Sequence, residues 1–447
     1  MSKSVLLTNA RIVNEGKIFS GHVLIADGRI QEVFSDEDNA FPKVEMINCE
    51  GKLLIPGVID DQVHFREPGL THKADLFTES RAAVAGGVTS FMDMPNTIPN
   101  TLTLDLLEEK FQLAAEKSLA NYSFYMGASN HNISELGKAD PSKICGIKVF
   151  MGSSTGNMLV NDPFALQEIF SLGRIPVAVH CEDETIIQKN TKIFHARYGE
   201  NIPMECHPLI RSAEACYKSS AYAVELAYKK RTRLHLLHLS TAKEMQLLSN
   251  TIPLSEKKIT GEVCVYHLWF DESDYARKGS FIKWNPAIKT ASDRQALLKA
   301  VLNNTLDIIA TDHAPHTLEE KQHSYFATPS GGPLVQHSLL MMLELYHRKQ
   351  ISLEKIVEKM CHHPALCFGI RERGFLQKGY YADLVLIDLN ASETVSRENI
   401  FYKCGWSPLE GETFHSKITH TFVNGNLVYQ NGAFNNNEMG MRLSFNR

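Results

Sequence analysis

Five apolar segments of this chain, far apart in the sequence, each lead into a residue that can carry charge or bind a metal ion. These residues are His64, Lys148, His180, His238 and Asp312. In a (β/α)8 barrel the carboxyl ends of the strands converge on one rim, so residues from distant segments can share one site there. Imidazole nitrogens and carboxylate oxygens are common zinc ligands. The pattern therefore predicts an α/β protein, a (β/α)8 barrel, with a metal-dependent hydrolase centre on its rim.

The order of the expected elements favours this fold. Strands are predicted at 88–92, 122–126, 147–151, 176–180, 234–239, 259–268 and 306–311. Helices are predicted at 75–85, 104–119, 163–170, 211–229, 241–248, 292–302, 335–346 and 353–360. Repeated βα units favour a parallel sheet with consecutive strands as neighbours. A doubly wound sheet is the rival fold, but no GxGxxG or GxxxxGK[ST] loop follows any of these strands.

Both ends of the chain have β character instead. Near the N-terminus, strands at 23–26 and 30–34 flank Asp27-Gly28, a strong hairpin-turn signal. Near the C-terminus, strands are predicted at 382–388 and 418–429. We therefore expect residues 1–54 and 375–447 to form one small β-sandwich-like domain around a barrel of residues 55–374.

Composition and charge exclude several classes of protein. A net charge of −5 argues against a nucleic-acid partner or a polybasic membrane surface. No apolar stretch is long enough to span a bilayer, and the first nine residues turn polar too early for a signal peptide. The nine cysteines form no CxxC pair and fit reduced, buried thiols. We expect a cytoplasmic enzyme that acts on a small molecule, with no nucleic-acid or membrane partner.

Lys148 is the unusual member of the set of five, because zinc would repel an ammonium group. Two interpretations are open. One is a structural ion pair. The other is a neutral lysine that has captured carbon dioxide, since a carbamate is an anion with two oxygens that could bridge two cations.

Other candidate residues follow the predicted strands. A carboxylate at Asp312 could accept a proton and return it to a leaving nitrogen, although it could also cap a helix or form an ion pair. Arg66 and Asn96 together make a carboxylate clamp, since arginine presents a planar fork to a carboxylate. Taken singly, each could instead have a surface or turn role, and His316 could simply cap a loop.

Several other motifs have weaker interpretations. Residues 152–156 match GxSxG, the serine-hydrolase elbow, but no clear helix follows the serine. The cluster Cys361-His362-His363 precedes Pro364 and is interpreted as a helix end. His267 could support a metal ligand from behind, but core packing is favoured. The HExxH zinc-protease motif is absent.

Several of these segments resemble the dihydroorotases of the amidohydrolase superfamily. The motifs, in chain order, are Asp60-Asp61-Gln62-Val63-His64-Phe65-Arg66-Glu67-Pro68-Gly69, Met94-Pro95-Asn96-Thr97, Gly146-Ile147-Lys148, Val179-His180-Cys181-Glu182, His235-Leu236-Leu237-His238-Leu239-Ser240, Thr311-Asp312-His313-Ala314-Pro315-His316-Thr317-Leu318-Glu319-Glu320-Lys321 and Trp406-Ser407-Pro408-Leu409-Glu410-Gly411. The similarity runs from about residue 50 to about residue 430, and residues 311–321 are its most specific part. The resemblance implies zinc-dependent, reversible cyclisation of N-carbamoyl-L-aspartate to L-dihydroorotate in pyrimidine (UMP) synthesis.

The resemblance also assigns roles to individual residues. It implies that His64 and Asp312 bind one zinc ion, that His180 and His238 bind another, and that carboxylated Lys148 bridges them. Asp312 would also be the catalytic acid and base. The substrate carboxylate would be held by Arg66, Asn96 and His316, and the ring contacted by Asn285. Ser154 and Thr155 would belong to a substrate-covering loop.

Gln62 departs from the family pattern, which usually has histidine at this position. Because strand residues alternate sides, Gln62 and His64 face the same way, so Gln62 occupies a ligand position. An amide oxygen is a poor zinc ligand beside imidazole. We therefore expect one or two zinc ions per chain, with the first site weaker or partly filled.

Two alternatives remain open on the sequence. One is another cyclic amidohydrolase, such as an allantoinase or hydantoinase, which would share the metals but would not need a carboxylate clamp. The other is an inactive homologue that serves as a scaffold for a transcarbamoylase, which Gln62 alone favours. By analogy with other barrel hydrolases, we expect a homodimer.

Overall fold

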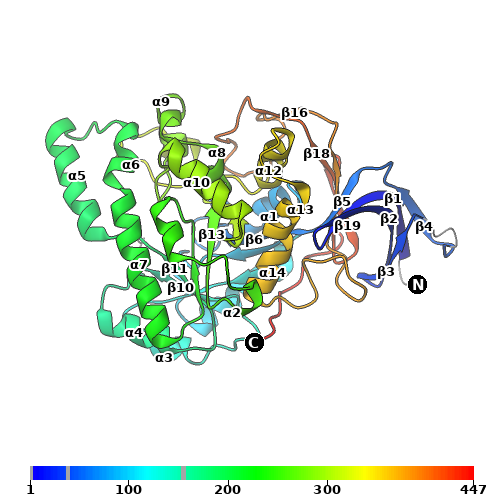
Figure 1. The fold of residues 1–447 in the computed structure, drawn as a ribbon, viewed down its shortest axis with the longest axis horizontal. Coiled ribbons are helices and arrows are strands. Elements are labelled where there is room, and N and C mark those ends of the chain that lie inside the picture. The colour runs from blue at the N-terminus through cyan, green and yellow to red at the C-terminus, as the bar shows by residue number, and fades with distance from the viewer. Residues whose placement is uncertain (1–3, 37–40, 153–157) are drawn as a thin grey trace.

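The computed structural model describes residues 4–36, 41–152 and 158–447. Its central feature is a barrel of parallel strands (Figure 1). The strands are β6 (Val58–Val63), β7 (Val88–Asp93), β8 (Asn121–Phe124), β9 (Met126–Gly127), β10 (Ile147–Phe150), β11 (Val177–His180), β12 (Leu234–Leu236), β13 (Ile259–Cys264) and β14 (Ile308–Ala310). Only Tyr125 separates β8 from β9, so these two form one interrupted strand.

Hydrogen bonds link the first and last strands of the barrel. Strands β6, β7 and β8 pair in order, and β9 to β14 pair in order, all of them parallel. The amide of His64 donates to the carbonyl of His313 at 2.7 Å, and Val63 bridges to His313. The described residues therefore form a closed barrel with eight strand positions, which confirms the predicted fold class.

Helices cover the outside of this barrel. The longer ones are α1 (Leu76–Ala85), α2 (Leu104–Lys117), α4 (Pro163–Ser171), α5 (Glu184–Tyr198), α7 (Ala213–Lys230), α10 (Ala291–Leu302) and α12 (Ser338–His347). Shorter ones are α3 (Ile133–Leu136), α6 (His207–Ile210), α8 (Val265–Trp269), α9 (Tyr275–Lys278), α11 (Leu318–Lys321), α13 (Leu353–Val357) and α14 (His363–Phe368). Local sequence sets their ends. Helix α1, for example, starts at a capping box of Asp75 and Thr78 and stops before Gly87, whose φ is 80°.

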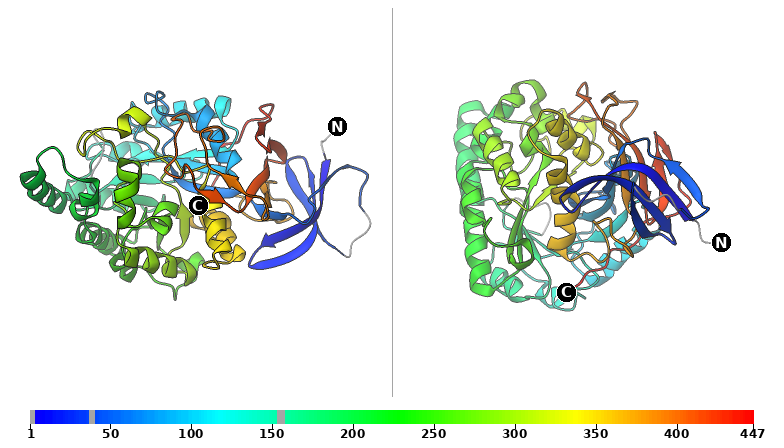
Figure 2. Two further views of the ribbon diagram at one scale, coloured as in Figure 1. Left: turned by 90° about the horizontal axis from the view of Figure 1, so that it is seen from above. Right: turned by 45° about the vertical axis from the view of Figure 1, so that its right-hand side comes forward.

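A second sheet combines strands from both ends of the chain and lies to one side of the barrel (Figure 2). Its strands are β1 (Ser4–Asn14), β2 (Lys17–Ala26), β3 (Arg29–Ser35), β4 (Glu45–Asn48), β5 (Leu53–Pro56), β15 (Leu384–Asp388), β18 (Lys417–Val423), β19 (Asn426–Gln430) and β20 (Ala433–Phe434). The two ends meet where β5 pairs antiparallel with β15, with Leu54 opposite Leu386. The short strands β16 (Glu393–Thr394) and β17 (Thr413–Phe414) form a separate pair. The domain boundaries after residues 54 and 374 stay predictions.

Three predicted elements were wrong in part. The strand expected at 259–268 ends at Cys264, and the chain continues as helix α8. The sequence did not distinguish the two, because an apolar run that is buried on every side shows no periodicity. The helix expected at 241–248 is a 3-10 turn over Lys243–Leu247. The helical segment does not end at Cys361-His362-His363. A π-helical turn (Glu358–His362) leads into α14, where Pro364 lies in the first turn and costs no hydrogen bond.

Helix α5 was not predicted at all. Of its side chains only Ile187 is fully buried, and Ile186, Phe194 and Tyr198 are partly buried against the same cluster, so the apolar stripe is narrow and was overlooked in the sequence. None of the helices in the described ranges combines the length and apolar character that crossing a membrane requires.

A buried ion pair joins the barrel to the second sheet, and it generates a stability prediction. Arg373 pairs with Asp383, and Asp383 also accepts from the Asn121 amide at 3.2 Å and the Asn424 backbone at 2.8 Å. Replacing Asp383 with Ala leaves a buried guanidinium unpaired, so the free energy of unfolding should fall by about 3–5 kcal/mol. Chemical denaturation measures this loss.

Glu372→Gln is the matched control. It removes an exposed carboxylate that pairs with Arg29 at 2.7 Å, and it should cost less than about 1 kcal/mol. Equal losses in the two variants would contradict the structural role of the buried pair.

Candidate active site

A cavity of about 640 Å³ opens at the carboxyl ends of the barrel strands. All ten side chains that the sequence nominated for metal or substrate binding line it. They are Gln62, His64, Arg66, Asn96, Lys148, His180, His238, Asn285, Asp312 and His316. The structure thus brings the whole predicted set together.

The first pair of donor groups joins the ends of β6 and β14. His64 Nε2 lies 3.1 Å from Asp312 Oδ1, and His64 Nδ1 lies 2.8 Å from Asn96 Oδ1. The Gln62 amide donates to Asp312 Oδ1 at 3.2 Å, and the Tyr266 hydroxyl donates to Asp312 Oδ2 at 3.1 Å. Both carboxylate oxygens of Asp312 are therefore held by neighbours, and Gln62 takes part through its nitrogen.

The second pair joins the ends of β11 and β12. His180 Nδ1 faces His238 Nε2 at 2.9 Å, and His180 Nε2 bonds to Glu182 Oε2 at 2.9 Å. An ion pair with Arg211 holds Glu182 in turn. Burial lowers the pKa of both histidines, so the rings are neutral and can offer lone pairs to a cation. Carboxylate support behind a histidine is a common feature of metal-binding histidines.

Lys148 is the second residue of β10, the strand that pairs with β11. Its side chain is almost fully buried, and its ammonium lies 4.6 Å from the centre of the Phe150 ring. Burial lowers the pKa of Lys148 to about 8. Within the described residues no carboxylate forms an ion pair with it, so the ion-pair interpretation gains no support there.

The backbone is strained at three of the cavity residues. Arg66, His238 and Asp312 have φ values of 68°, 38° and 47°, in the left-handed region that non-glycine residues rarely adopt. Strain of this kind is retained where the surrounding structure enforces it, and it concentrates at functional sites.

Arg66 and His316 line the same cavity and contact each other. Arg66 Nε donates to the Pro315 carbonyl at 3.0 Å, and its Nη2 lies 3.1 Å from His316 Nε2. Burial lowers the pKa of Arg66 to about 10, which still leaves it charged at neutral pH. Within the described ranges no carboxylate forms an ion pair with this guanidinium, although it is only 7% exposed.

Both ring nitrogens of His316 have polar neighbours. The Lys73 ammonium lies 3.1 Å from Nδ1, and the Ser330 carbonyl and Arg66 Nη2 each lie 3.1 Å from Nε2. Burial and the charge of Arg66 hold the pKa of His316 well below its ordinary value. The neutral ring carries one proton, and its other nitrogen can accept from Arg66 or Lys73.

Sequence reasoning missed Glu182, Tyr266 and Lys73. Glu182 follows His180 by two positions, so strand alternation could have found it. Tyr266 lies in the short helix α8 and Lys73 lies in a loop, and neither position can be recognised from a periodic sequence pattern. His267 packs against Tyr266 and bonds to the Pro286 carbonyl at 3.3 Å, which supports the packing interpretation. Ser154, Thr155 and most of the GxSxG match lie outside the described residues.

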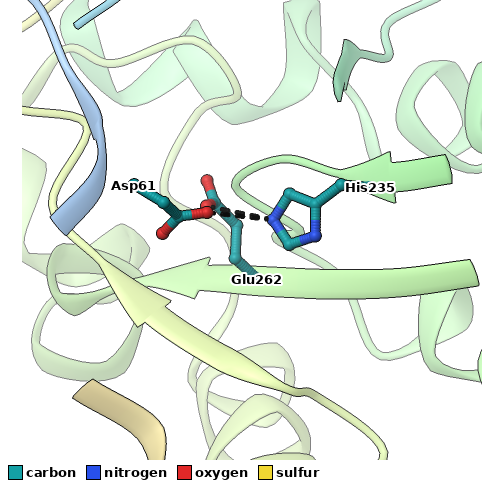
Figure 3. A group of neighbouring side chains, drawn as sticks. All are labelled: Asp61, His235 and Glu262. Atoms are coloured by element: carbon teal, nitrogen blue, oxygen red, sulfur yellow. Dashed lines mark hydrogen bonds and ion pairs between the residues drawn. The ribbon is translucent and has the colours of Figure 1, made fainter. Parts of the chain in front are cut away.

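A different cluster of potential metal ligands lies one layer deeper in the barrel. Asp61, His235 and Glu262 bring their donor atoms within 4.8 Å of one another (Figure 3). Each precedes the rim residues on its own strand, and none of the three lines the cavity. They are 0–2% exposed.

The fold is a barrel of parallel strands, and its rim carries histidines, a carboxylate and a buried lysine. This arrangement is typical of metal-dependent hydrolases. The model of the amidohydrolase family matches residues 53–428. This chain belongs to the amidohydrolase family. Enzymes of this family are generally metal-dependent.

Individual relatives differ in the cyclic amide that their names specify. The dihydroorotase of Methanosarcina acetivorans is 31% identical over 417 residues, which cover 91% of this chain and 88% of that protein. The allantoinase of Solibacter usitatus is 31% identical over 442 residues, covering 96% and 94%. The solved structure of L-hydantoinase (dihydropyrimidinase) from Arthrobacter aurescens has a TM-score of 0.93 at 27% identity, covering 99% of this chain and all of that one. The protein is a hydrolase that acts on cyclic amides, and its substrate is a small molecule.

The contacts of His316 predict how its pKa responds to a charge change. Replacing Lys73 with Met removes an ammonium that repels a proton on the ring, so the pKa of His316 should rise towards its ordinary value. In the wild type the ring should titrate well below the ordinary range of a histidine. NMR titration of isotope-labelled histidines measures the difference.

Glu320→Gln is the opposing control. Glu320 contacts His316 Nδ1 at 3.6 Å and favours the charged ring, so its removal should lower the pKa of His316 further. An unchanged or lowered pKa in Lys73→Met would contradict the assigned contacts.

Proposed function

We propose that this protein is a zinc-dependent dihydroorotase, which interconverts N-carbamoyl-L-aspartate and L-dihydroorotate in pyrimidine synthesis. One observation carries the proposal. Arg66 is a buried guanidinium beside the cavity, and no carboxylate pairs with it within the described part of the chain. An unpaired buried charge is costly unless a ligand compensates it. Dihydroorotate is a cyclic amide that carries a carboxylate, whereas the parent hydantoin ring and allantoin have none.

The donor set fits divalent metal ions. His180 Nδ1 and His238 Nε2 face each other as neutral nitrogens, and His238 Nδ1 is a buried atom without a partner among the described residues. In this proposal His180 and His238 would hold one zinc ion, His64 and Asp312 would hold another, and carboxylated Lys148 would contribute its oxygens to the site. A bound metal supplies Lewis acidity towards the amide carbonyl and lowers the pKa of water. Gln62 offers an amide in place of an imidazole, so the His64 side holds metal less tightly.

Capture of carbon dioxide by Lys148 requires the neutral amine. Burial favours that form by lowering the pKa of Lys148 to about 8, which leaves a useful neutral fraction near neutral pH. The Lys148 nitrogen then forms a bond to the carbon of carbon dioxide and loses a proton, which leaves a carbamate anion.

Asp312 is the proposed acid and base. The Tyr266 hydroxyl, the Gln62 amide and His64 hold its two oxygens, so its orientation in the cavity is fixed. In hydrolysis the carboxylate takes the proton released by water and passes it to the departing ring nitrogen. In cyclisation the protons move in the reverse direction.

Arg66, Asn96 and His316 would orient the substrate through its carboxylate. Arg66 presents a planar fork, and His316 lies beside it, with Nε2 3.1 Å from Arg66 Nη2. Asn285 has a buried side-chain oxygen without a partner among the described residues, which suits a contact with the ring amide. Holding the reacting groups in attack geometry can contribute several kcal/mol to the rate.

Replacing Arg66 with Met tests the proposal. The variant should lose about 100-fold or more in kcat/KM for dihydroorotate, because it removes one partner of a buried charge pair worth about 3 kcal/mol. Its zinc content should stay at the wild-type level. Steady-state kinetics in the hydrolytic direction and metal analysis measure the two effects.

Arg81→Met is a matched control, because Arg81 is also 7% exposed but lies on α1, outside the residues that line the cavity. It should retain wild-type kcat/KM. Equal losses in both variants, or unchanged kinetics in Arg66→Met, would contradict the proposed clamp.

A hydantoinase or allantoinase activity is the second candidate, and the similarity to the solved L-hydantoinase and to the allantoinase favours it. Turnover of dihydroorotate, hydantoin and allantoin by the zinc-loaded protein separates the candidates. Dihydroorotate should be preferred, and no turnover of any of the three would support an inactive scaffold. The cytoplasmic location and the homodimer stay predictions from the sequence.

A further inference from the structure

Asp61, His235 and Glu262 form a buried cluster that the proposed reaction does not use. They come from β6, β12 and β13, and their side chains point towards one another inside the barrel (Figure 3). The same three strands carry Gln62, His238 and Cys264 closer to the rim. The cluster therefore ties together strands that contribute to the candidate metal centre.

Glu262 makes a direct contact with the backbone of a candidate metal ligand. Its Oε1 accepts from the His238 amide at 3.0 Å. The neighbouring amides bond differently: Leu237 donates to the Val179 carbonyl, and Leu239 donates to the Glu262 carbonyl. The amide of His238 is thus held by a side chain, at the position where φ is 38° and the backbone is strained.

Burial and the neighbouring Asp61 raise the pKa of Glu262 well above its ordinary value, and the positive charge of His235 acts in the opposite direction. His235 Nε2 lies 3.3 Å from Glu262 Oε2 and 3.2 Å from Asp61 Oδ2. Its Nδ1 lies 2.8 Å from the Thr260 hydroxyl, which donates to the Leu234 carbonyl and therefore accepts from the ring. Both ring nitrogens then carry protons. Burial alone would lower the pKa of His235, but the bonds to Asp61 and Glu262 raise it to about 9.

Asp61 is held by its ion pair with His235. Its side chain is fully buried, and within the described residues its carboxylate has no contact with a backbone amide or a hydroxyl group. Its ion pair with His235 fixes it, and it helps to keep that ring charged and in place between the two carboxylates. A buried network of this kind is stable only while its charges remain paired.

We propose that Asp61, His235 and Glu262 form an ionic brace that positions the imidazole of His238 for metal binding. Glu262 anchors the strained backbone of His238, His235 holds Glu262, and Asp61 holds His235. These are positioning residues, since none of them lines the cavity. The inference rests on the proposed metal centre.

A metal ion within the cluster is the competing explanation, since the three donor atoms lie close enough to share one. Two contacts favour the brace. One oxygen of Glu262 is committed to the His238 amide, and His235 Nε2 lies 3.2 and 3.3 Å from the carboxylates of Asp61 and Glu262, which keep a proton on that nitrogen. The test below separates the two explanations.

Glu262→Gln and Asp61→Asn test the brace. Zinc affinity is measured by competition with a chromogenic chelator, and the Tm of each metal-free protein is measured alongside. Loss of an outer partner of a metal ligand typically costs about 10–100-fold in metal affinity. We expect Glu262→Gln to weaken zinc binding by this factor and Asp61→Asn to weaken it less.

Asp307→Asn is the matched control. Asp307 is also a buried carboxylate that accepts from a backbone amide, Gly261 at 3.1 Å, and pairs with a cation, Lys257 at 2.6 Å. It lies before β14, at the end of the barrel away from the cavity. This variant should lower Tm while leaving zinc affinity unchanged.

The outcomes are distinct. Zinc affinities within about twofold of the wild type in both Glu262→Gln and Asp61→Asn would overturn the brace, even if Tm falls as in the control. An extra metal equivalent in the wild type that Asp61→Asn loses would overturn it in favour of a metal site. If Glu262→Gln does not fold, the zinc affinity of Asp61→Asn alone tests the brace.

A wild type that binds no zinc would contradict the proposed function together with the brace. If the wild type binds zinc and turns over dihydroorotate, and both variants keep the zinc affinity of the wild type, only the brace is contradicted.

Discussion

Closure of the barrel between β6 and β14 is the constraint on which the site depends. The backbone amide of His64 donates a hydrogen bond to the carbonyl of His313. The carboxylate of Asp60 accepts from the amide and the hydroxyl of Thr311 at 3.2 and 2.6 Å. These contacts join segments that are about 250 residues apart in the chain. They place Gln62, His64 and Arg66 opposite Asp312 and His316. The contacts between β6 and β14 therefore bring the carboxylate of Asp312 next to His64 and place His316 next to Arg66.

The barrel divides its cavity into two regions of different electrostatic character. On one side, burial keeps His180 and His238 neutral and lowers the pKa of Lys148, which suits groups that must offer lone pairs. On the other side, Arg66 stays charged and has no carboxylate partner within the described ranges. The relatives share the barrel but are named for different cyclic amides. We therefore expect the region around Arg66, more than the region of His180, His238 and Lys148, to determine substrate choice.

Sequence reasoning found the rim because chemistry and periodicity coincide there. An apolar run that ends in His180 or Asp312 marks both a buried strand and its functional end, so one pattern predicted fold and site together. It failed where position depends on packing. The Tyr266 contact with Asp312 requires α8, which lies in a run buried on all sides, and the Lys73 contact with His316 depends on a loop. Glu262 belongs to a predicted strand, but only the fold shows that it reaches the His238 backbone.

Anomalous scattering at the zinc edge, from crystals grown with zinc, tests the central claim most directly, because it locates bound metal without reference to activity. The account predicts a strong peak at His180 Nδ1 and His238 Nε2, a weaker one beside His64 and Asp312, and carbamate density on Lys148. Metal confined to Asp61, His235 and Glu262, or a rim without any peak, would contradict it.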